Sequence, residues 1–150
     1  MVMIRKFEPK DIGSIMQIWL EANINAHHFI PKKYWISQYP SVQKRMPDAD
    51  VYVYEKENQI QGFAGMTDNY LAGIFVDEQY RSMGIGKSLL EYIKKIYPSF
   101  TLTVYQKNQR AADFYKREGL SVVSKGIDAS TAEQEVTLIW ERSPQTDGKE

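Results

Sequence analysis

The sequence predicts a mixed α/β fold whose sheet is mostly antiparallel. Runs rich in β-branched and aromatic residues, which favour strands, alternate with segments in which apolar residues recur at helical spacing. Three strand-forming runs in the middle of the chain are separated only by short turns, which is typical of antiparallel neighbours. A later run is joined to the one before it by a helix, as in a strand–helix–strand unit.

The first third of the chain is expected to form one strand and two helices. The strand covers Met3 to Phe7, and Glu8 to Asp11 then opens a helix, because proline and acids favour the first turn. Asn23 to His28 is expected to be a loop. The second helix, Ile30 to Met46, is expected to break near Pro40, since proline lacks a backbone donor. Apolar residues at helical spacing mark the first helix: Ile12, Ile15, Met16, Trp19 and Leu20.

The rest of the chain is expected to supply the other six strands and two more helices. Pro98 ends the third helix, Asn108 can cap the fourth, and Gly119 can stop it. Three strands come first: Asp50 to Glu55, Ile60 to Met66 and Tyr70 to Val76. A loop from 77 to 83 follows, and then a helix at Gly84 to Tyr97, a strand at Thr101 to Tyr105, a helix at Asn108 to Glu118, and strands at Ser121 to Ser124 and Glu135 to Trp140.

Length and composition indicate one globular domain over residues 1–142, with a polar tail over 143–150 that we expect to be disordered. Lys plus Arg and Asp plus Glu both total 19, and this balance argues against nucleic acid as a partner. The absence of cysteine excludes disulfides and thiolate metal sites, and two adjacent histidines are a poor basis for another metal site. We therefore expect no bound metal. No apolar run is long enough for a membrane span and no secretory signal is visible, so we expect a cytoplasmic protein.

The strongest functional signal is the segment Arg81-Ser82-Met83-Gly84-Ile85-Gly86-Lys87-Ser88, between a strand and a helix. Such a loop exposes backbone N–H groups at the positive end of the helix, which favours a pyrophosphate. The P-loop pattern would need glycine at Arg81, and the dinucleotide fingerprint would need glycine at Leu89. A third pattern, Arg/Gln-x-x-Gly-x-Gly/Ala, is matched in full by Arg81, Gly84 and Gly86.

With this loop the chain resembles the GNAT family of acetyl-CoA-dependent N-acetyltransferases. Ile74-Phe75-Val76 looks like the family's apolar fourth strand, although Glu78 stands where the family often has proline. Downstream, Val104 to Leu120 is similar to the second family signature, which runs Asn, Ala, Phe-Tyr and Gly-Phe/Leu. The segments 18–21 and 26–30 look like those of small stand-alone bacterial members of the YjaB and YiaC type. The resemblance implies a sheet of six to seven strands, splayed between strands 4 and 5 and flanked by about four helices.

The resemblance also implies direct transfer of an acetyl group from acetyl-CoA to an amine. Tyr115 would protonate the departing thiolate, and a backbone N–H near Val76 would stabilise the thioester oxygen. Gly73 could form the bulge that splays the fourth strand. The residues expected to contact acetyl-CoA are Ile74, Phe75, Val76, Arg81, Ser82, Met83, Gly84, Ile85, Gly86, Lys87, Ser88, Asn108, Phe114 and Tyr115.

The acceptor side is less defined. His27 is a candidate base, with Glu21, Asp68, Glu78 and a water relay as alternatives. The acceptor-site candidates are Trp19, His27, Phe29, Tyr34, Trp35 and Tyr39. The acceptor is expected to be a primary amine of a small molecule or of a protein lysine or N-terminus, and the family's frequent dimers leave a homodimer open. Two other functions remain open: a catalytically silent acyl-CoA-binding or sensing module of the same fold, and a nucleotide-phosphate hydrolase.

Overall fold

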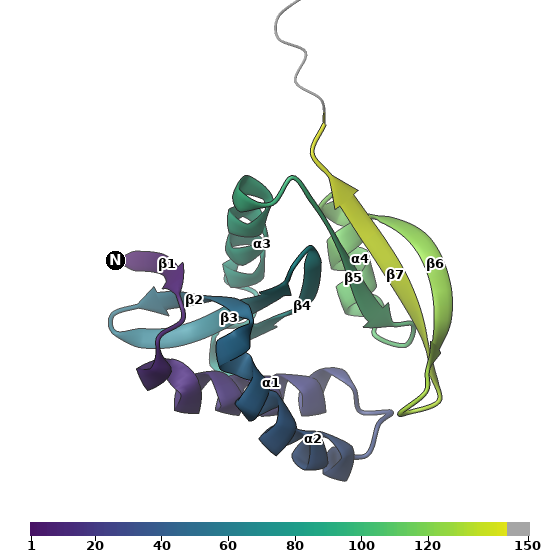
Figure 1. Ribbon diagram of the computed structural model, residues 1–150, viewed down its shortest axis with the longest axis horizontal. Coiled ribbons are helices and arrows are strands. Elements are labelled where there is room, and N and C mark those ends of the chain that lie inside the picture. The colour runs from purple at the N-terminus through teal and green to yellow at the C-terminus, as the bar shows by residue number, and fades with distance from the viewer. Residues whose placement is uncertain (144–150) are drawn as a thin grey trace, which may run out of the picture.

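A computed structural model describes residues 1–143 of the chain, and in them seven strands form a single sheet (Figure 1). The order across the sheet is β1-β2-β3-β4-β5-β7-β6, and only the pair β4–β5 is parallel. The predicted mixed α/β fold with a mostly antiparallel sheet is therefore confirmed. The strands are β1 (Val2–Lys6), β2 (Asp50–Lys56), β3 (Gln59–Thr67), β4 (Tyr70–Val76), β5 (Ser99–Tyr105), β6 (Ser121–Asp128) and β7 (Glu133–Glu141).

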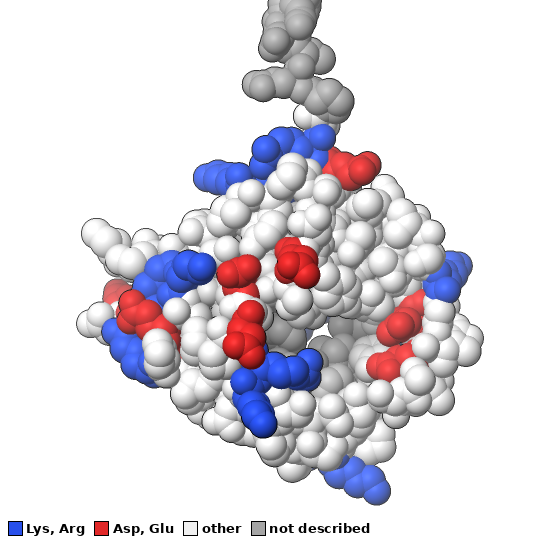
Figure 2. All heavy atoms as spheres, viewed as in Figure 1, with Lys and Arg blue, Asp and Glu red and all other residues white. Residues whose placement is uncertain are grey.

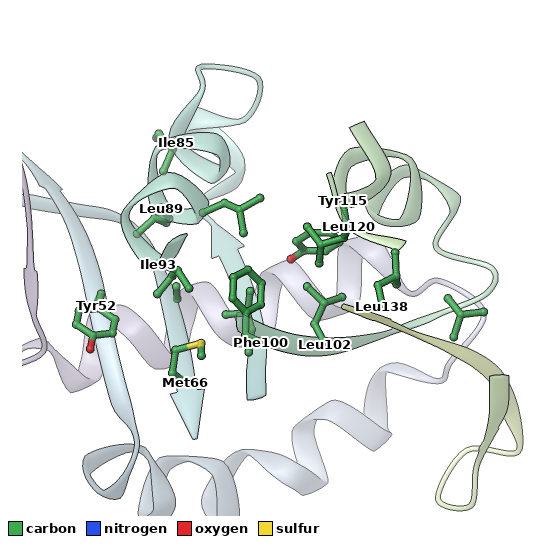
Figure 3. Packing of buried hydrophobic residues seen from close by; sticks show 14 residues of the cluster. Tyr52, Met66, Ile85, Leu89, Ile93, Phe100, Leu102, Tyr115, Leu120 and Leu138 are labelled. Atoms are coloured by element: carbon green, nitrogen blue, oxygen red, sulfur yellow. The ribbon is translucent and has the colours of Figure 1, made fainter. Parts of the chain in front are cut away.

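Four α-helices cover the two faces of this sheet, α1 and α2 on one face and α3 and α4 on the other (Figure 1). Each face has its own hydrophobic core. Ile15, Trp19 and Phe63 belong to the core under α1 and α2, while Leu89 and Phe100 belong to the core under α3 and α4 (Figure 3). The helices are α1 (Ile12–Ala26), α2 (Lys32–Arg45), α3 (Ile85–Ile96) and α4 (Gln109–Arg117), with short 3-10 turns at η1 (Pro9–Asp11), η2 (Met46–Asp48) and η3 (Glu78–Tyr80).

Two expectations about the first helices were wrong. Helix α1 continues to Ala26, although a loop was expected to begin at Asn23. The buried side-chain amide of Asn23 donates from Nδ2 to the Trp19 backbone carbonyl at 2.9 Å, so this polar group is satisfied inside the helix. Helix α2 continues through Pro40. Pro40 is exposed, so water can solvate the carbonyl that loses its helical donor.

The sheet opens between β4 and β5. These strands pair only at Tyr70 with Thr101 and at Leu71 with Leu102, and within residues 1–143 no strand pairs with the rest of this edge of β4. On its other edge, β4 carries a bulge at Ala72, since Gly65 of β3 lies opposite Gly73 while the next residue of β3 lies opposite Leu71. The splay between strands 4 and 5 that the family resemblance implies is thus present, and the bulge lies at Ala72, one residue before the expected Gly73.

None of the helices in residues 1–143 has the length and apolar character needed to cross a bilayer. A single domain over 1–142 stays a prediction. The predicted disordered tail lies outside the described residues from position 144 onward.

Candidate active site

A cavity of about 360 Å³ lies where β4 and β5 part, and the molecule is visibly hollowed beside β5 (Figure 2). Segments from most of the chain line it: β4 and β5 contribute backbone and side chains, α1 and α2 contribute aromatic rings, α4 contributes Tyr115, and β6 and β7 contribute carboxylates. Side chains far apart in the sequence therefore meet at this opening. The lining side chains that bear on chemistry are Trp19, Asn23, His27, Trp35, Thr103, Tyr105, Asn108, Tyr115, Asp128 and Glu135.

The free edge of β4 forms one side of the cavity. Gly73, Ile74 and Phe75 line it, while Val76 lies at the end of the strand outside the lining. An unpaired strand edge presents backbone N–H and C=O groups that an extended chain with amide groups can pair with. A Cβ atom on Gly73 would lie 2.5 Å from the ring of Phe75, so the bare glycine allows that ring its position.

The glycine loop ends at the start of α3, as predicted. Ser82 and Gly84 adopt positive φ angles of 64° and 81°, and α3 begins at Ile85 without a side-chain cap. The first amides of an uncapped helix have no internal partners and lie at its positive end, which suits an anion. The loop approaches the cavity elements at Gly86, where an added Cβ would lie 3.9 Å from both Ile74 and Phe114.

The basic side chains of the loop lie in ion pairs with acids. Arg81 contacts Glu78 at 3.1 Å, and Lys87 contacts Glu118 at 3.2 Å. A further cation, which was not among the predicted site residues, approaches from α4, where the Arg110 guanidinium donates to the Ser82 hydroxyl at 3.4 Å. The sequence feature that could have indicated this cation is the position of Arg110, two residues after the predicted cap Asn108 and inside the second GNAT signature.

Tyr115 is almost fully buried at 6% exposure and lies against the cavity, and its hydroxyl points from α4 toward β4 (Figure 3). Burial raises the pKa of this phenol well above its ordinary value, so the group is protonated at neutral pH. Phe114, the residue before it, packs against the core under α3 and α4 and contacts the Tyr115 ring edge to face. The structure thus brings Tyr115, but not Phe114, to the cavity.

His27 and Asn108 both line the cavity and are in direct contact with one another. The His27 Nε2 lies 3.2 Å from the Asn108 Nδ2, and the Asn108 Oδ1 accepts from the Ala111 amide, so both ends of this side-chain amide are engaged. The imidazole stacks on Trp35, and its buried Nδ1 has no hydrogen-bond partner in the described part of the chain. Burial lowers the pKa of His27 to about 4, opposed by the Asn23 backbone carbonyl, and this low pKa makes it a poor proton acceptor.

The predicted acceptor aromatics fall into two groups. Trp19 and Trp35 are buried and line the cavity. Phe29 and Tyr34 instead line a neighbouring open groove of about 570 Å³ between the α1–α2 connection and the β6–β7 turn. Tyr39 packs edge to face on Trp19 behind the cavity wall.

Two carboxylates in the lining were not predicted, Asp128 at the end of β6 and Glu135 on β7. The Tyr105 hydroxyl donates to Asp128 at 2.6 Å, and burial followed by the charge of Asp128 raises the pKa of Glu135. Asp128 lies on the part of β6 that continues beyond the predicted strand at Ser121 to Ser124, whereas Glu135 begins the strand predicted at Glu135 to Trp140 and was not singled out as a site residue. Acidic side chains are visible over these strands beside the hollow (Figure 2). Across residues 1–143, no group of three or more His, Asp or Glu side chains is arranged to hold a metal ion.

The family model described as the acetyltransferase (GNAT) domain matches residues 47–119. Peptidyl-lysine N-acetyltransferase YiaC of Escherichia coli is 35% identical to this chain over 123 residues, which cover 81% of the chain and 84% of YiaC. The chain belongs to the GNAT family of N-acetyltransferases. Another GNAT relative, peptidyl-lysine N-acetyltransferase YjaB of Salmonella typhimurium, is 27% identical over 126 residues, which cover 83% of this chain and 87% of YjaB.

Solved GNAT structures share the fold. The solution structure of apo YjaB from Escherichia coli superposes with a TM-score of 0.84 at 23% identity, over 95% of this chain and 99% of that one. The PaiA N-acetyltransferase of Thermoplasma acidophilum, in complex with coenzyme A, gives a TM-score of 0.78 at 18% identity, over 94% and 99% of the two chains. These findings confirm the predicted GNAT fold, the enzyme class and the resemblance to YiaC and YjaB.

Proposed function

We propose that this enzyme transfers the acetyl group of acetyl-CoA to the ε-amine of lysine in a protein or peptide. The observation that supports it most is the opening between β4 and β5, where a free strand edge and the phenol of Tyr115 line one cavity, while the uncapped start of α3 approaches the lining residue Ile74 at Gly86. Its acceptor class is supported by the peptidyl-lysine activity named for YiaC and YjaB.

The residues present fit coenzyme A as substrate. Its pyrophosphate carries negative charge, which suits the uncapped amides at the start of α3, with Arg110 close to Ser82 on the same loop. Its pantetheine arm contains amides, which suit the unpaired edge of β4 at Gly73 to Phe75. The thioester at the end of that arm would then reach the part of the cavity that Tyr115 lines.

The chain's own groups then have three tasks. The edge of β4 orients the thioester, and a backbone N–H near Val76 stabilises the oxygen on which charge develops, an effect typically worth about 3–4 kcal/mol. Tyr115 holds a proton at neutral pH and donates it to the departing sulfur. The buried aromatic walls at Trp19 and Trp35 contact the alkyl stem of the acceptor.

The test is incubation of the purified enzyme with acetyl-CoA and lysine peptides whose N-termini are blocked. We expect release of free thiol that depends on peptide, together with a mass increase located on lysine. Peptides with arginine in place of lysine are the matched control and should stay unmodified. If coenzyme A binds but no amine in a panel of peptides and small molecules is acetylated, the chain is instead a silent acyl-CoA-binding module.

A further inference from the structure

The ionisable lining of the cavity has one sign of charge. Asp128 and Glu135 line it, and its other titratable groups are His27, Tyr70, Tyr105 and Tyr115, with no lysine or arginine among the lining residues that the structure describes. The low pKa of His27, about 4, keeps its imidazole neutral at pH 7. The thioester brings no charge, so the two carboxylates are left for a cation that enters with the acceptor.

Glu135 lines this cavity from strand β7. In the sheet it lies directly opposite Tyr105 of β5 on one side and Gly126 of β6 on the other, so its side chain shares a face with the Tyr105 ring. A Cβ added to Gly126 would meet nothing within 4 Å, so the space beside Glu135 is open.

The two carboxylates differ in how they are held. Asp128 accepts from the Tyr105 hydroxyl at 2.6 Å and from the Ser130 amide at 2.9 Å, so both of its oxygens are engaged. Within the described part of the chain, Glu135 has neither an ion pair nor a side-chain hydrogen bond, whereas the nearby Glu133 is paired with Lys107 at 3.2 Å. Glu135 is therefore the carboxylate that is free to contact a ligand.

A second observation at the same cavity also indicates a missing partner. Trp35, which is only 7% exposed, lines the cavity and has a buried Nε1–H without a hydrogen-bond partner among the residues that the structure describes. Trp19 meets Trp35 edge to face at 6.0 Å, and the two rings form an apolar wall. An apolar wall and a free carboxylate in the same cavity fit an alkyl ammonium, because a methylene stem can pack on the rings while the charge contacts the acid.

From this arrangement we infer that Glu135 binds the ε-ammonium of the acceptor lysine and accepts its proton as the amine attacks, with Asp128 as the fixed negative charge beside it. The inference rests on the proposed lysine acceptor. The anionic part of coenzyme A and the cationic acceptor would then occupy opposite ends of the site, the first at the start of α3 and the second at β6 and β7.

The proton and bond balance is complete without another reactant. One proton passes from the ammonium to Glu135, and the neutral amine forms the new C–N bond to the thioester carbon. The C–S bond breaks as Tyr115 protonates the sulfur, and the second nitrogen proton returns to Tyr115. Glu135 releases its proton to water, so each transfer yields an amide, free coenzyme A and one proton. The raised pKa of Glu135 makes it a better proton acceptor than an ordinary carboxylate.

The test compares two acceptors in one enzyme. A lysine peptide is cationic at pH 7, whereas an aromatic amine is uncharged there and needs no ammonium site. We expect Glu135→Gln to lower kcat/KM for the lysine peptide by about tenfold or more, while the value for the aromatic amine stays within about threefold. Glu135→Asp keeps the charge on a shorter stem and should recover part of the loss.

Glu133→Gln, two residues away on the same strand, is the matched control and should leave both acceptors within about threefold of the parent enzyme. Coenzyme A affinity, measured by calorimetry, should be the same in every variant. Equal loss for both acceptors in Glu135→Gln, or no loss for either, would overturn the inference. Failure of the parent enzyme to acetylate any lysine peptide would instead overturn the proposed acceptor.

Discussion

His27 Nε2 and Asn108 Nδ2 lie 3.2 Å apart and join two positions separated by 81 residues. The amide of Asn108 can only donate from Nδ2, so the imidazole accepts at Nε2 and carries its proton on Nδ1. Because the Asn108 Oδ1 also caps α4 through the Ala111 amide, the contact connects the end of α1 to the helix that carries Tyr115. His27 therefore acts in this structure as a neutral hydrogen-bond acceptor that positions α4.

The first prediction is that His27 makes the stability of the fold depend on pH. Burial lowers the pKa of His27 to about 4, below its unfolded value near 6.5. Above pH 6.5 both states are neutral, and as the pH falls toward 4 the unfolded chain takes up a proton that the folded chain refuses. The free energy of unfolding should therefore fall by about 1–2 kcal/mol from pH 7 to pH 5, as measured by urea denaturation.

His27→Gln should remove most of this pH dependence, since glutamine does not titrate. The neighbouring His28 is exposed and supplies a matched control, because His28→Gln should keep the pH dependence of the parent protein. A parent protein whose unfolding free energy is flat between pH 7 and pH 5 would show that the imidazole is not held neutral.

The second prediction separates two glycines of the loop. Gly84 has a φ of 81°, so Gly84→Ala should cost about 1 kcal/mol of stability through backbone strain alone, since nothing lies within 4 Å of the added Cβ. Gly86 lies inside α3, where alanine fits at 3.9 Å from its neighbours and favours the helix. Gly86→Ala should thus fold at least as stably but bind coenzyme A about tenfold more weakly, because its methyl group blocks the loop amides.

Urea denaturation and calorimetry with coenzyme A measure the two effects. If Gly86→Ala bound coenzyme A as tightly as the parent enzyme, the amides of this loop would not be in contact with the pyrophosphate.

The loop and the β4 strand could be predicted from local sequence. The glycine loop comes directly before α3, as its place in the sequence predicted, and β4 begins at Tyr70 and ends at Val76 as expected, because the turn signals on either side are strong. Asn108 caps α4 and Gly119 ends it with a φ of 98°. These features depend on backbone geometry within a few residues, which is the information that a single sequence carries.

The acceptor end could not be predicted in the same way. Glu135 gains its place from its pairing opposite Tyr105, and the neutral state of His27 depends on burial against Trp35. Both are long-range relationships between strands or helices that local patterns do not encode. The break expected at Pro40 failed for a related reason, since its cost depends on whether water reaches the freed carbonyl.

The third prediction concerns the splayed strand. A Cβ on Gly73 would lie 2.5 Å from the Phe75 ring, which is stacked on Phe63 with centroids 4.9 Å apart. Gly73→Ala should therefore force the ring to move and lower the unfolding free energy by about 1–3 kcal/mol, with weaker binding of coenzyme A at the β4 edge. Gly65 lies directly opposite in β3 with nothing within 4 Å of an added Cβ, so Gly65→Ala is the matched control and should be tolerated. Equal stability of the two variants would contradict the prediction.

The fourth prediction tests the proton donor. The Tyr115 hydroxyl lies against the cavity and makes no hydrogen bond within residues 1–143, so Tyr115→Phe should unfold at the same denaturant concentration as the parent enzyme. Its turnover of acetyl-CoA with a lysine peptide should nevertheless fall at least about tenfold, because the sulfur then leaves without a proton. The affinity for coenzyme A should not change, since the ring is retained. Tyr92→Phe, which alters a phenol in the same core but away from the cavity, should leave turnover intact. Unchanged turnover in Tyr115→Phe would remove this phenol from the reaction and leave water as the source of the proton.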